Sequence, residues 1–288
     1  SINGTSWQLQ TPPSNVPIGL NSNNSLYSIE AGGNHSLYLL NNGNVLACGL
    51  NDFGQLGDNT TTQRNTVVPV PTLSNVISLS GGLSFSMALL NDGTVRTWGL
   101  NTNGQLGNNS TTSSSTPVDV LNISTATKVA SHETALHSLA LLSNGTVMAW
   151  GLNTSGQLGD NTTTQRNSPV TVIGINNAIA ISAGLDFSLA LLADGTIKAW
   201  GLNSFGQLGD NSTTQRNTPV LVSGITNAIA ISASSETHSL ALLSDGTIRS
   251  WGRNLYGQLG NNSTTNSSIP VSVSNITNAI KIKTCANT

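Results

Sequence analysis

Three histidines recur at one position of an internal repeat, where side chains of this type could hold a metal ion. His35, His137 and His238 each precede a serine and a leucine, whereas Phe85 and Phe187 stand at this position in two other copies. Phenylalanine in two of the five copies argues against a ring of metal ligands. We expect the histidines to be packing residues with one hydrogen bond each, and the sequence predicts neither a metal site nor a cofactor.

Acidic side chains gather in a neighbouring turn whose length varies between copies. We count the residues from the last apolar residue of the first predicted strand to the His/Phe position. This distance is six residues in the first, second and fourth copies, eight in the third copy and seven in the fifth. The longer turns contain His132 and Glu133, and Glu236, while Asp186 occupies the turn between them. Because loops that differ in length and charge on one rim are typical of binding faces, we predict a binding rim at these four residues. Such a negative arc favours a basic partner patch or a cation.

Residue combinations typical of catalysis are weak. His137 and Ser138 are adjacent, but the serine falls within a predicted buried strand. Glu133 and Glu236 could face each other across the rim, although two carboxylates alone are a weak sign of a hydrolase. The Gly-x-Asn-x-x-Gly-Gln-Leu-Gly loop has no lysine and precedes a strand, unlike a phosphate-binding loop, which precedes a helix. We therefore expect a protein that is not an enzyme.

The stretch from Asp194 to Gly209 returns along the chain in nearly identical copies. The first glycine of each Gly-Gln-Leu-Gly defines steps of 50, 52, 50 and 51 residues, at Gly54, Gly104, Gly156, Gly206 and Gly257. A period near fifty residues predicts a propeller, a solenoid or an array.

Each copy contains four short apolar runs, which we interpret as strands. In the fourth copy they are 178–181, 187–192, 196–200 and 218–222. Asn-Gly or Asp-Gly separates the second and third runs of every copy, and these pairs supply the positive φ angles of a type I′ hairpin. Pro219 suits an edge strand, because proline donates no ladder hydrogen bond. We predict an all-β propeller of four-stranded antiparallel blades.

The repeat resembles that of the regulator of chromosome condensation (RCC1-type) family, through His-Ser-Leu-Ala-Leu, Asp-Gly-Thr, Trp-Gly-x-Asn and Gly-Gln-Leu-Gly. The resemblance covers essentially the whole chain and implies a β-propeller that acts mostly through protein contacts. Family members are usually seven-bladed. Some exchange nucleotide on a small GTPase, and a similar secreted propeller inhibits β-lactamases.

We expect residues 1–288 to form a single domain with five complete repeats and one composite blade. Residues 3–9 look like a shortened third strand, residues 16–18 like a fourth strand and residues 279–282 like a first strand, which gives six blade positions. As alternatives, the chain is part of a seven-bladed propeller, or a neighbouring molecule supplies the missing strand. The repeats lie near 26–75, 76–126, 127–177, 178–227 and 228–278, with the partial closing blade at 1–25 and 279–288.

Tryptophan closes the predicted third strand in four copies, and Cys48 takes its place in the first. We expect these tryptophans, together with the loop glycines, to be equivalent structural residues: Trp98, Trp150, Trp200 and Trp251. Cys48 and Cys285 would form a disulfide if the ring closure brings them together. After the glycine loop, three copies carry an Asp and an Arg six residues apart, which suggests a local ion pair.

The bulk composition limits the function classes. Charged residues make up 8% of the 288 residues, the net charge is -2 and no basic run is present, so we expect no nucleic-acid partner. No apolar stretch is long enough to predict a membrane span. We expect a secreted or cell-surface bacterial protein that binds a protein or glycan through a propeller rim. Alternatives are an assembly subunit joined through its terminal strands, an enzyme inhibitor or, least favoured, a guanine-nucleotide exchange factor.

Overall fold

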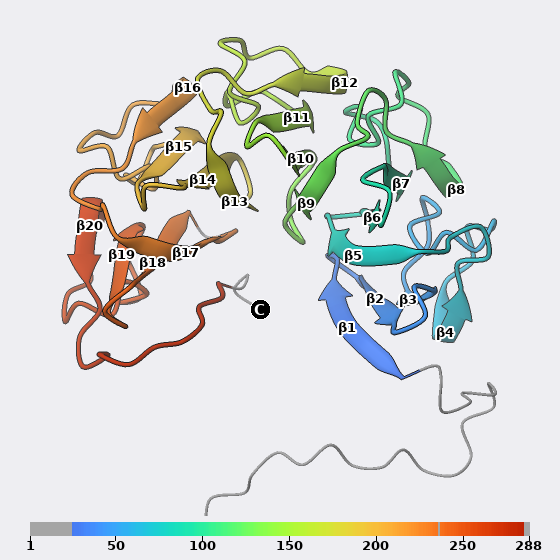
Figure 1. The fold of residues 1–288 in the computed structure, drawn as a ribbon, viewed down its shortest axis with the longest axis horizontal. Helices are drawn as coiled ribbons and strands as arrows, with labels where there is room; N and C mark the ends of the chain where they lie inside the picture. The colour runs from blue at the N-terminus through green and yellow to red at the C-terminus, as the bar shows by residue number, and fades with distance from the viewer. Residues whose placement is uncertain (1–24, 236, 285–288) are drawn as a thin grey trace, which may run out of the picture.

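The computed structural model describes residues 25–235 and 237–284, which form twenty strands in five four-stranded antiparallel sheets. The sheets are arranged around a common centre as propeller blades, and the described part of the ring is open between blade five and blade one (Figure 1). Each blade follows chain order from its inner to its outer strand. The predicted all-β fold with four-stranded antiparallel blades is confirmed.

The strands of successive blades have nearly equal lengths. Blades one and two contain β1 (Leu26–Ala31), β2 (His35–Leu40), β3 (Val45–Gly49), β4 (Arg64–Pro69), β5 (Val76–Gly81), β6 (Phe85–Leu90), β7 (Val95–Gly99) and β8 (Ser114–Asp119). Blade three contains β9 (Ala126–Ala130), β10 (His137–Leu142), β11 (Val147–Gly151) and β12 (Arg166–Thr171). Blades four and five contain β13 (Ala178–Ala183), β14 (Phe187–Leu192), β15 (Ile197–Gly201), β16 (Arg216–Leu221), β17 (Ala228–Ala233), β18 (His238–Leu243), β19 (Ile248–Gly252) and β20 (Ser267–Ser272).

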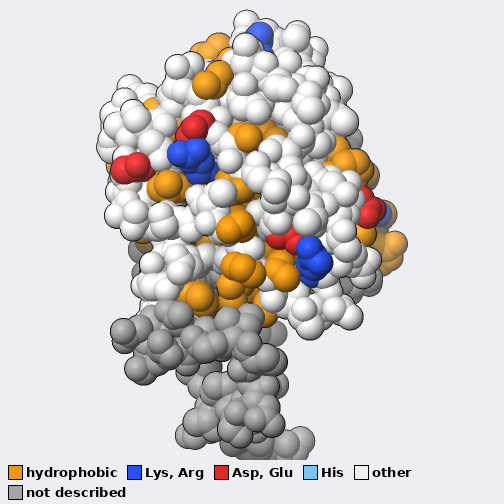
Figure 2. Space-filling model, turned by 90° about the vertical axis from the view of Figure 1, so that its right-hand side faces the viewer, with side chains coloured by type: hydrophobic (Ala, Val, Ile, Leu, Met, Phe, Trp, Pro, Cys, Tyr) orange, Lys and Arg blue, Asp and Glu red, His pale blue; other side chains and the backbone are white. Residues whose placement is uncertain are grey.

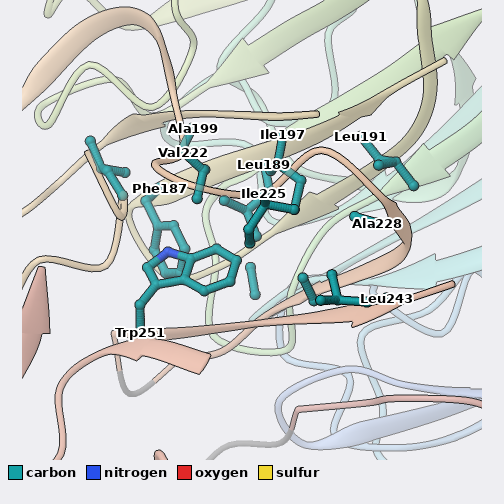
Figure 3. Close-up of a cluster of buried hydrophobic side chains, with 13 residues drawn as sticks. Phe187, Leu189, Leu191, Ile197, Ala199, Val222, Ile225, Ala228, Leu243 and Trp251 are labelled. Atoms are coloured by element: carbon teal, nitrogen blue, oxygen red, sulfur yellow. The ribbon is translucent and has the colours of Figure 1, made fainter. Parts of the chain in front are cut away.

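The hydrophobic core consists of separate clusters between neighbouring blades. One cluster joins blades four and five, where Trp251 packs against Phe187, Leu189 and Val222 of the preceding blade (Figure 3). The other three clusters are built in the same way around Trp98, Trp150 and Trp200. Burial of both faces of the second strands β6, β10 and β14 explains why their sequences are almost continuously apolar.

Each buried tryptophan also makes one directional contact with the preceding blade. Its Nε1 donates a hydrogen bond of 2.8–2.9 Å to the glutamine carbonyl of that blade's Gly-Gln-Leu-Gly loop. The second loop glycine lies against the indole ring, since a Cβ at Gly57, Gly107, Gly159 or Gly209 would lie 2.8–3.0 Å from ring atoms. We call this arrangement the tryptophan–loop contact. It links each of blades two to five to the blade before it.

The glycine loop is held by its buried asparagine. In blade four, Asn203 Nδ2 donates to Asp210 and to the backbone oxygens of Ser212 and Thr214, while its Oδ1 accepts from the Leu208 backbone N–H. All three predicted ion pairs are present, with N–O distances of 2.6–2.7 Å, between Asp58 and Arg64, Asp160 and Arg166, and Asp210 and Arg216.

The C-terminal described segment continues the pattern of the inner strands. Residues 279–284 are not assigned as a strand, and they run toward the centre of the ring (Figure 1). Thr284 nevertheless reproduces a contact between neighbouring inner strands, because its backbone N–H donates to Ser232 Oγ at 3.0 Å, as that of Ala233 does to Ser182 Oγ. The segment therefore lies where the first strand of a sixth blade would lie. The rest of the predicted closing blade is outside the described residues.

Candidate binding site at the channel mouth

The inner strands surround a central channel, and a cavity of about 450 Å³ lies at the end where they finish. Its walls contain the last two residues of most inner strands, residues 131–133 of blade three, and Lys283 and Thr284. In a blade of four antiparallel strands, the turn from first to second strand and the loop from third to fourth strand lie at the same end. The cavity therefore opens on the face that also carries the glycine loops.

The longer turn of blade three reaches across this mouth. Residues 132–135 form a turn closed by the Ala135 backbone N–H and the His132 carbonyl at 2.8 Å. The Leu83 backbone N–H of blade two donates to the Ala135 carbonyl at 3.1 Å. A Cβ added to Gly33 of blade one would lie 2.9 Å from the Glu133 carbonyl oxygen. The two inserted residues thus bring blade three into contact with the turns of both preceding blades.

Four charged or titratable side chains gather at the cavity: Glu30, His132, Glu133 and Lys283. Burial raises the pKa of the Glu30 carboxyl, and the positive charges of Lys283 and Lys281 partly offset that rise. Burial lowers the pKa of His132, Glu133 opposes this change, and Lys283 adds to it. These mutual effects place both lysines within electrostatic range of the acidic wall.

The structure separates the four residues of the predicted rim. His132 and Glu133 line the cavity. Asp186 does not; its Oδ1 accepts a hydrogen bond of 3.1 Å from Gln157 Nε2 in the glycine loop of blade three, and burial raises its pKa. Glu236 lies outside the described residues, so the predicted acidic arc rests here on Glu133.

Sequence reasoning missed Glu30 and Lys283, although the repeat carries a signal for both. They stand at the fifth position of the first strand, where Ser80, Ser182 and Ser232 stand in other copies. A charge at a position that is serine or alanine in the other copies marks a departure from the scaffold. The comparison of turns alone could not detect this signal, because it lies inside the strand.

The hydroxyl groups around the cavity are bonded to neighbouring backbone. Ser80 Oγ accepts from the Ser131 backbone N–H at 2.9 Å, and Ser131 Oγ donates to the His137 carbonyl at 3.0 Å. His132 Nδ1 lies 3.1 Å from Thr134 Oγ1. Among the described residues, no three His, Cys, Asp or Glu side chains gather to form a metal site.

The recurring histidines lie between blades, away from the channel wall. His35 and His137 place Nε2 2.9 and 3.0 Å from Ser86 Oγ and Ser188 Oγ of the following blade. Burial lowers their pKa values to about 4 and about 3. The prediction that they are packing residues with one hydrogen bond is confirmed for these two.

Only one of the two cysteines of the predicted disulfide, Cys48, lies among the described residues. The Cys48 thiol is free and lies 3.7 Å from the Tyr38 hydroxyl, whereas Cys285 is outside the described residues.

No described helix has the length and apolar character needed to cross a membrane. Charged groups are sparse on the side of the molecule near β4 and β8 (Figure 2).

Comparison with solved structures supports the architecture. Human WBSCR16 matches with a TM-score of 0.81 and 22% identity, over 95% of this chain and 73% of that protein. Yeast RCC1 (Prp20), solved bound to Kap60, matches with a TM-score of 0.73 and 24% identity, over 91% of this chain and 66% of that one. Prp20p from Saccharomyces cerevisiae, described with its binding properties to Gsp1p and histones, matches with a TM-score of 0.73 and 25% identity, over 90% and 67% of the two chains.

This chain thus spans about two thirds to three quarters of the length of these structures. The family model of the RCC1-like domain matches residues 4–288. The resemblance inferred from the repeat motifs is thereby confirmed, and the chain belongs to the family of RCC1-like domains.

Proposed function

We propose that this protein is a non-catalytic binding module that recognises a protein partner through the channel mouth, outside the cell or on its surface. The observation that carries the proposal is the gathering of Glu30, His132, Glu133 and Lys283 around one cavity. On a chain with only 8% charged residues, such a concentration gives this face most of its capacity for electrostatic recognition.

A basic side chain of the partner suits this mouth. The cavity volume of about 450 Å³ is ample for one extended side chain. The Glu30 carboxyl is half-buried and therefore less solvated than a surface carboxyl, so a cation gains more from this group than from an exposed one. Related propellers offer a parallel, because Prp20 was solved bound to Kap60 and was studied for binding to Gsp1p and histones.

The hydrogen bonds made by the serines of the cavity wall favour a binding function over catalysis. Ser80 and Ser182 accept hydrogen bonds from backbone N–H groups of the next inner strand, and Ser131 donates to a carbonyl. No described serine of the wall is held next to a histidine base, as nucleophilic catalysis requires. A glycan is the alternative ligand, since hydroxyl and carboxylate groups also recognise sugars.

A charge reversal at Glu133 tests the proposal. Binding partners captured on intact cells would be measured against the wild type, Glu133→Lys and Glu133→Gln. We expect Glu133→Lys to slow association by about tenfold and to leave the dissociation rate less changed, because charges at the edge of an interface act mainly on encounter. Cell fractionation would show whether the native protein is released or surface-bound.

Asp119→Lys is the matched control. Asp119 forms an exposed pair with Arg96 at 2.8 Å on outer strand β8, and the substitution makes the same change in net charge. Equal slowing by both variants would mean that net charge rather than the channel mouth governs association, and the proposed site would be wrong. Capture of free glycans that Glu133→Lys leaves unchanged would equally contradict a protein-binding mouth.

A further inference from the structure

The end of the ring opposite the channel mouth is formed by the hairpins between second and third strands and by the links from each fourth strand to the next blade. We call this surface the hairpin end. Each link is bound to the hairpin of the blade before it. In blade five, the Ala228 backbone N–H donates to the Gly195 carbonyl at 3.0 Å, and a Cβ at Gly195 would lie 2.6 Å from the Thr226 carbonyl oxygen. The surface is therefore held in place before any partner binds, which lowers the entropic cost of binding.

Exposed apolar side chains gather on the hairpin end. Ile77, Ile179 and Ile229 are the second residues of β5, β13 and β17, and they are 49%, 48% and 56% exposed. Each lies at a β-bulge, where the register with the second strand shifts. Leu121 and Ile173, in the links into blades three and four, are 39% and 47% exposed. Apolar residues that gather on one end in this way mark an interaction site, whereas single ones do not.

The fold itself does not require apolar residues at these positions. Thr127 stands at the position of the three isoleucines in blade three, beside the same kind of bulge. Ser223 stands at the position of Ile173 in the link into blade five. Because blades with these polar residues form the same sheets, the isoleucines are not needed for folding of the blade.

Charges of both signs accompany the apolar residues. Three hairpins carry an aspartate and, four positions later, a basic residue: Asp92 and Arg96, Asp194 and Lys198, and Asp245 and Arg249. These are the hairpins of blades two, four and five, the same blades whose first strands carry the exposed isoleucines. Blades one and three have uncharged residues at both positions.

The charged groups are held in fixed positions. The exposed Asp194 carboxylate accepts hydrogen bonds of 3.0 and 2.6 Å from the backbone N–H and hydroxyl of Thr196. Lys198 Nζ donates to the Gly174 carbonyl at 2.9 Å. An anionic surface such as a membrane or a nucleic acid would meet exposed aspartates here, and a basic surface would meet the lysine and arginine side chains. A surface with both signs is best matched by another with both signs.

A second copy of this chain has such a surface. We propose that two copies associate hairpin end to hairpin end about a two-fold axis, with the isoleucines of the inner strands at the centre and the charged hairpins around them. Such a contact pairs aspartates of one copy with bases of the other, and it closes at two copies. The apolar centre and polar rim are typical of protein interfaces. The two channel mouths face away from each other, so this association is independent of the proposed binding function.

Sedimentation velocity of the full chain over a wide concentration range tests the proposal. We expect a reversible equilibrium between monomer and dimer. The double variant Ile179→Thr, Ile229→Thr should raise the dissociation constant of the dimer by about tenfold or more, because each substitution removes apolar contact twice in a two-fold dimer. Urea unfolding checks that the variant is folded, as Thr127 leads us to expect. Ile173→Ser, which copies Ser223, tests the same surface outside the strands.

Leu255→Thr is the matched control. Leu255 is 54% exposed in the glycine loop of blade five, at the opposite end of the ring, and Thr102 and Thr154 stand at its position in blades two and three. We expect this variant to dimerise like the wild type. A wild-type chain that stays monomeric, or a dimer that the hairpin-end variants leave unchanged or that Leu255→Thr weakens equally, would overturn the proposal. Growth beyond dimers would show a head-to-tail contact and would equally contradict a two-fold one.

Discussion

Single residues at repeated positions show how this chain tolerates substitution. Histidine and phenylalanine alternate at the start of the second strand, because both fill the same space between blades and only histidine adds a hydrogen bond to the next blade. The sequence allowed this prediction, since an exchange within one chain shows what the position accepts. It could not show that complete burial lowers the pKa of His137 to about 3.

The buried histidines predict that acid destabilises the protein. The folded-state pKa of His137, about 3, lies below the ordinary value of 6.5, so the unfolded chain binds the proton first. Stability is therefore complete above pH 6.5 and falls as the pH decreases toward 3. Between pH 7 and pH 4.5, protonation of this residue should lower the free energy of unfolding by up to about 2.5 kcal/mol. Urea unfolding of His137→Phe at both pH values should show a correspondingly smaller loss; an unchanged loss would mean that His137 is not the sensitive group.

Removing a tryptophan should strongly weaken one interface between blades. The Trp200 side chain is fully buried, and its Nε1 donates to the Gln157 carbonyl at 2.8 Å. We expect Trp200→Ala to lower the free energy of unfolding by about 3–5 kcal/mol, because it leaves a large cavity and removes one of the two hydrogen bonds to the Gln157 carbonyl, the other coming from Ser188 Oγ. Trp200→Phe should cost less, since it retains most of the ring. A loss below about 1 kcal/mol for alanine in urea unfolding would contradict this role.

At the scale of the element, the glycine loop is stabilised mainly by its asparagine and less by the Asp–Arg pair. Blade two has Asn108 and Ser114 where blade one has Asp58 and Arg64, and its loop asparagine keeps the corresponding bonds to the backbone. In blade one, burial alone would raise the pKa of Asp58, but hydrogen bonds from Thr60 and Arg64 outweigh it and lower the pKa. The ion pair is thus one of several interactions on a carboxylate that is already bonded.

Replacing this pair with the residues of blade two should have a small effect. The Arg64 side chain is 33% exposed, so solvent screens much of its attraction to Asp58. We expect the double variant Asp58→Asn, Arg64→Ser to lose no more than about 1 kcal/mol in urea unfolding. The two single variants complete a double-mutant cycle that isolates the pair. A coupling energy well above that value would show that the pair is a main support of the loop.

At the scale of the whole molecule, the local pattern predicted the blades but could not predict which residues meet at the centre. The Asn-Gly and Asp-Gly turns and the apolar runs determine each sheet through short-range geometry, so they could be interpreted copy by copy. Glu30 and Lys283 lie at opposite ends of the sequence, and ring curvature brings them to one cavity. The turns alone placed Asp186 on the predicted rim between Glu133 and Glu236, but they could not show that its carboxylate accepts a hydrogen bond from Gln157 in the preceding blade's loop.

The tryptophan–loop contact has a mechanical consequence. Each blade is bound to its neighbours through the same small set of groups, and no described core cluster extends over more than two blades. Tension applied to the two ends should therefore load one interface after another rather than all at once. In single-molecule pulling, we expect a sawtooth of force peaks, each releasing about 50 residues and up to about 170 Å of extended chain. A single rupture that releases the whole chain would show instead that the blades yield as one body.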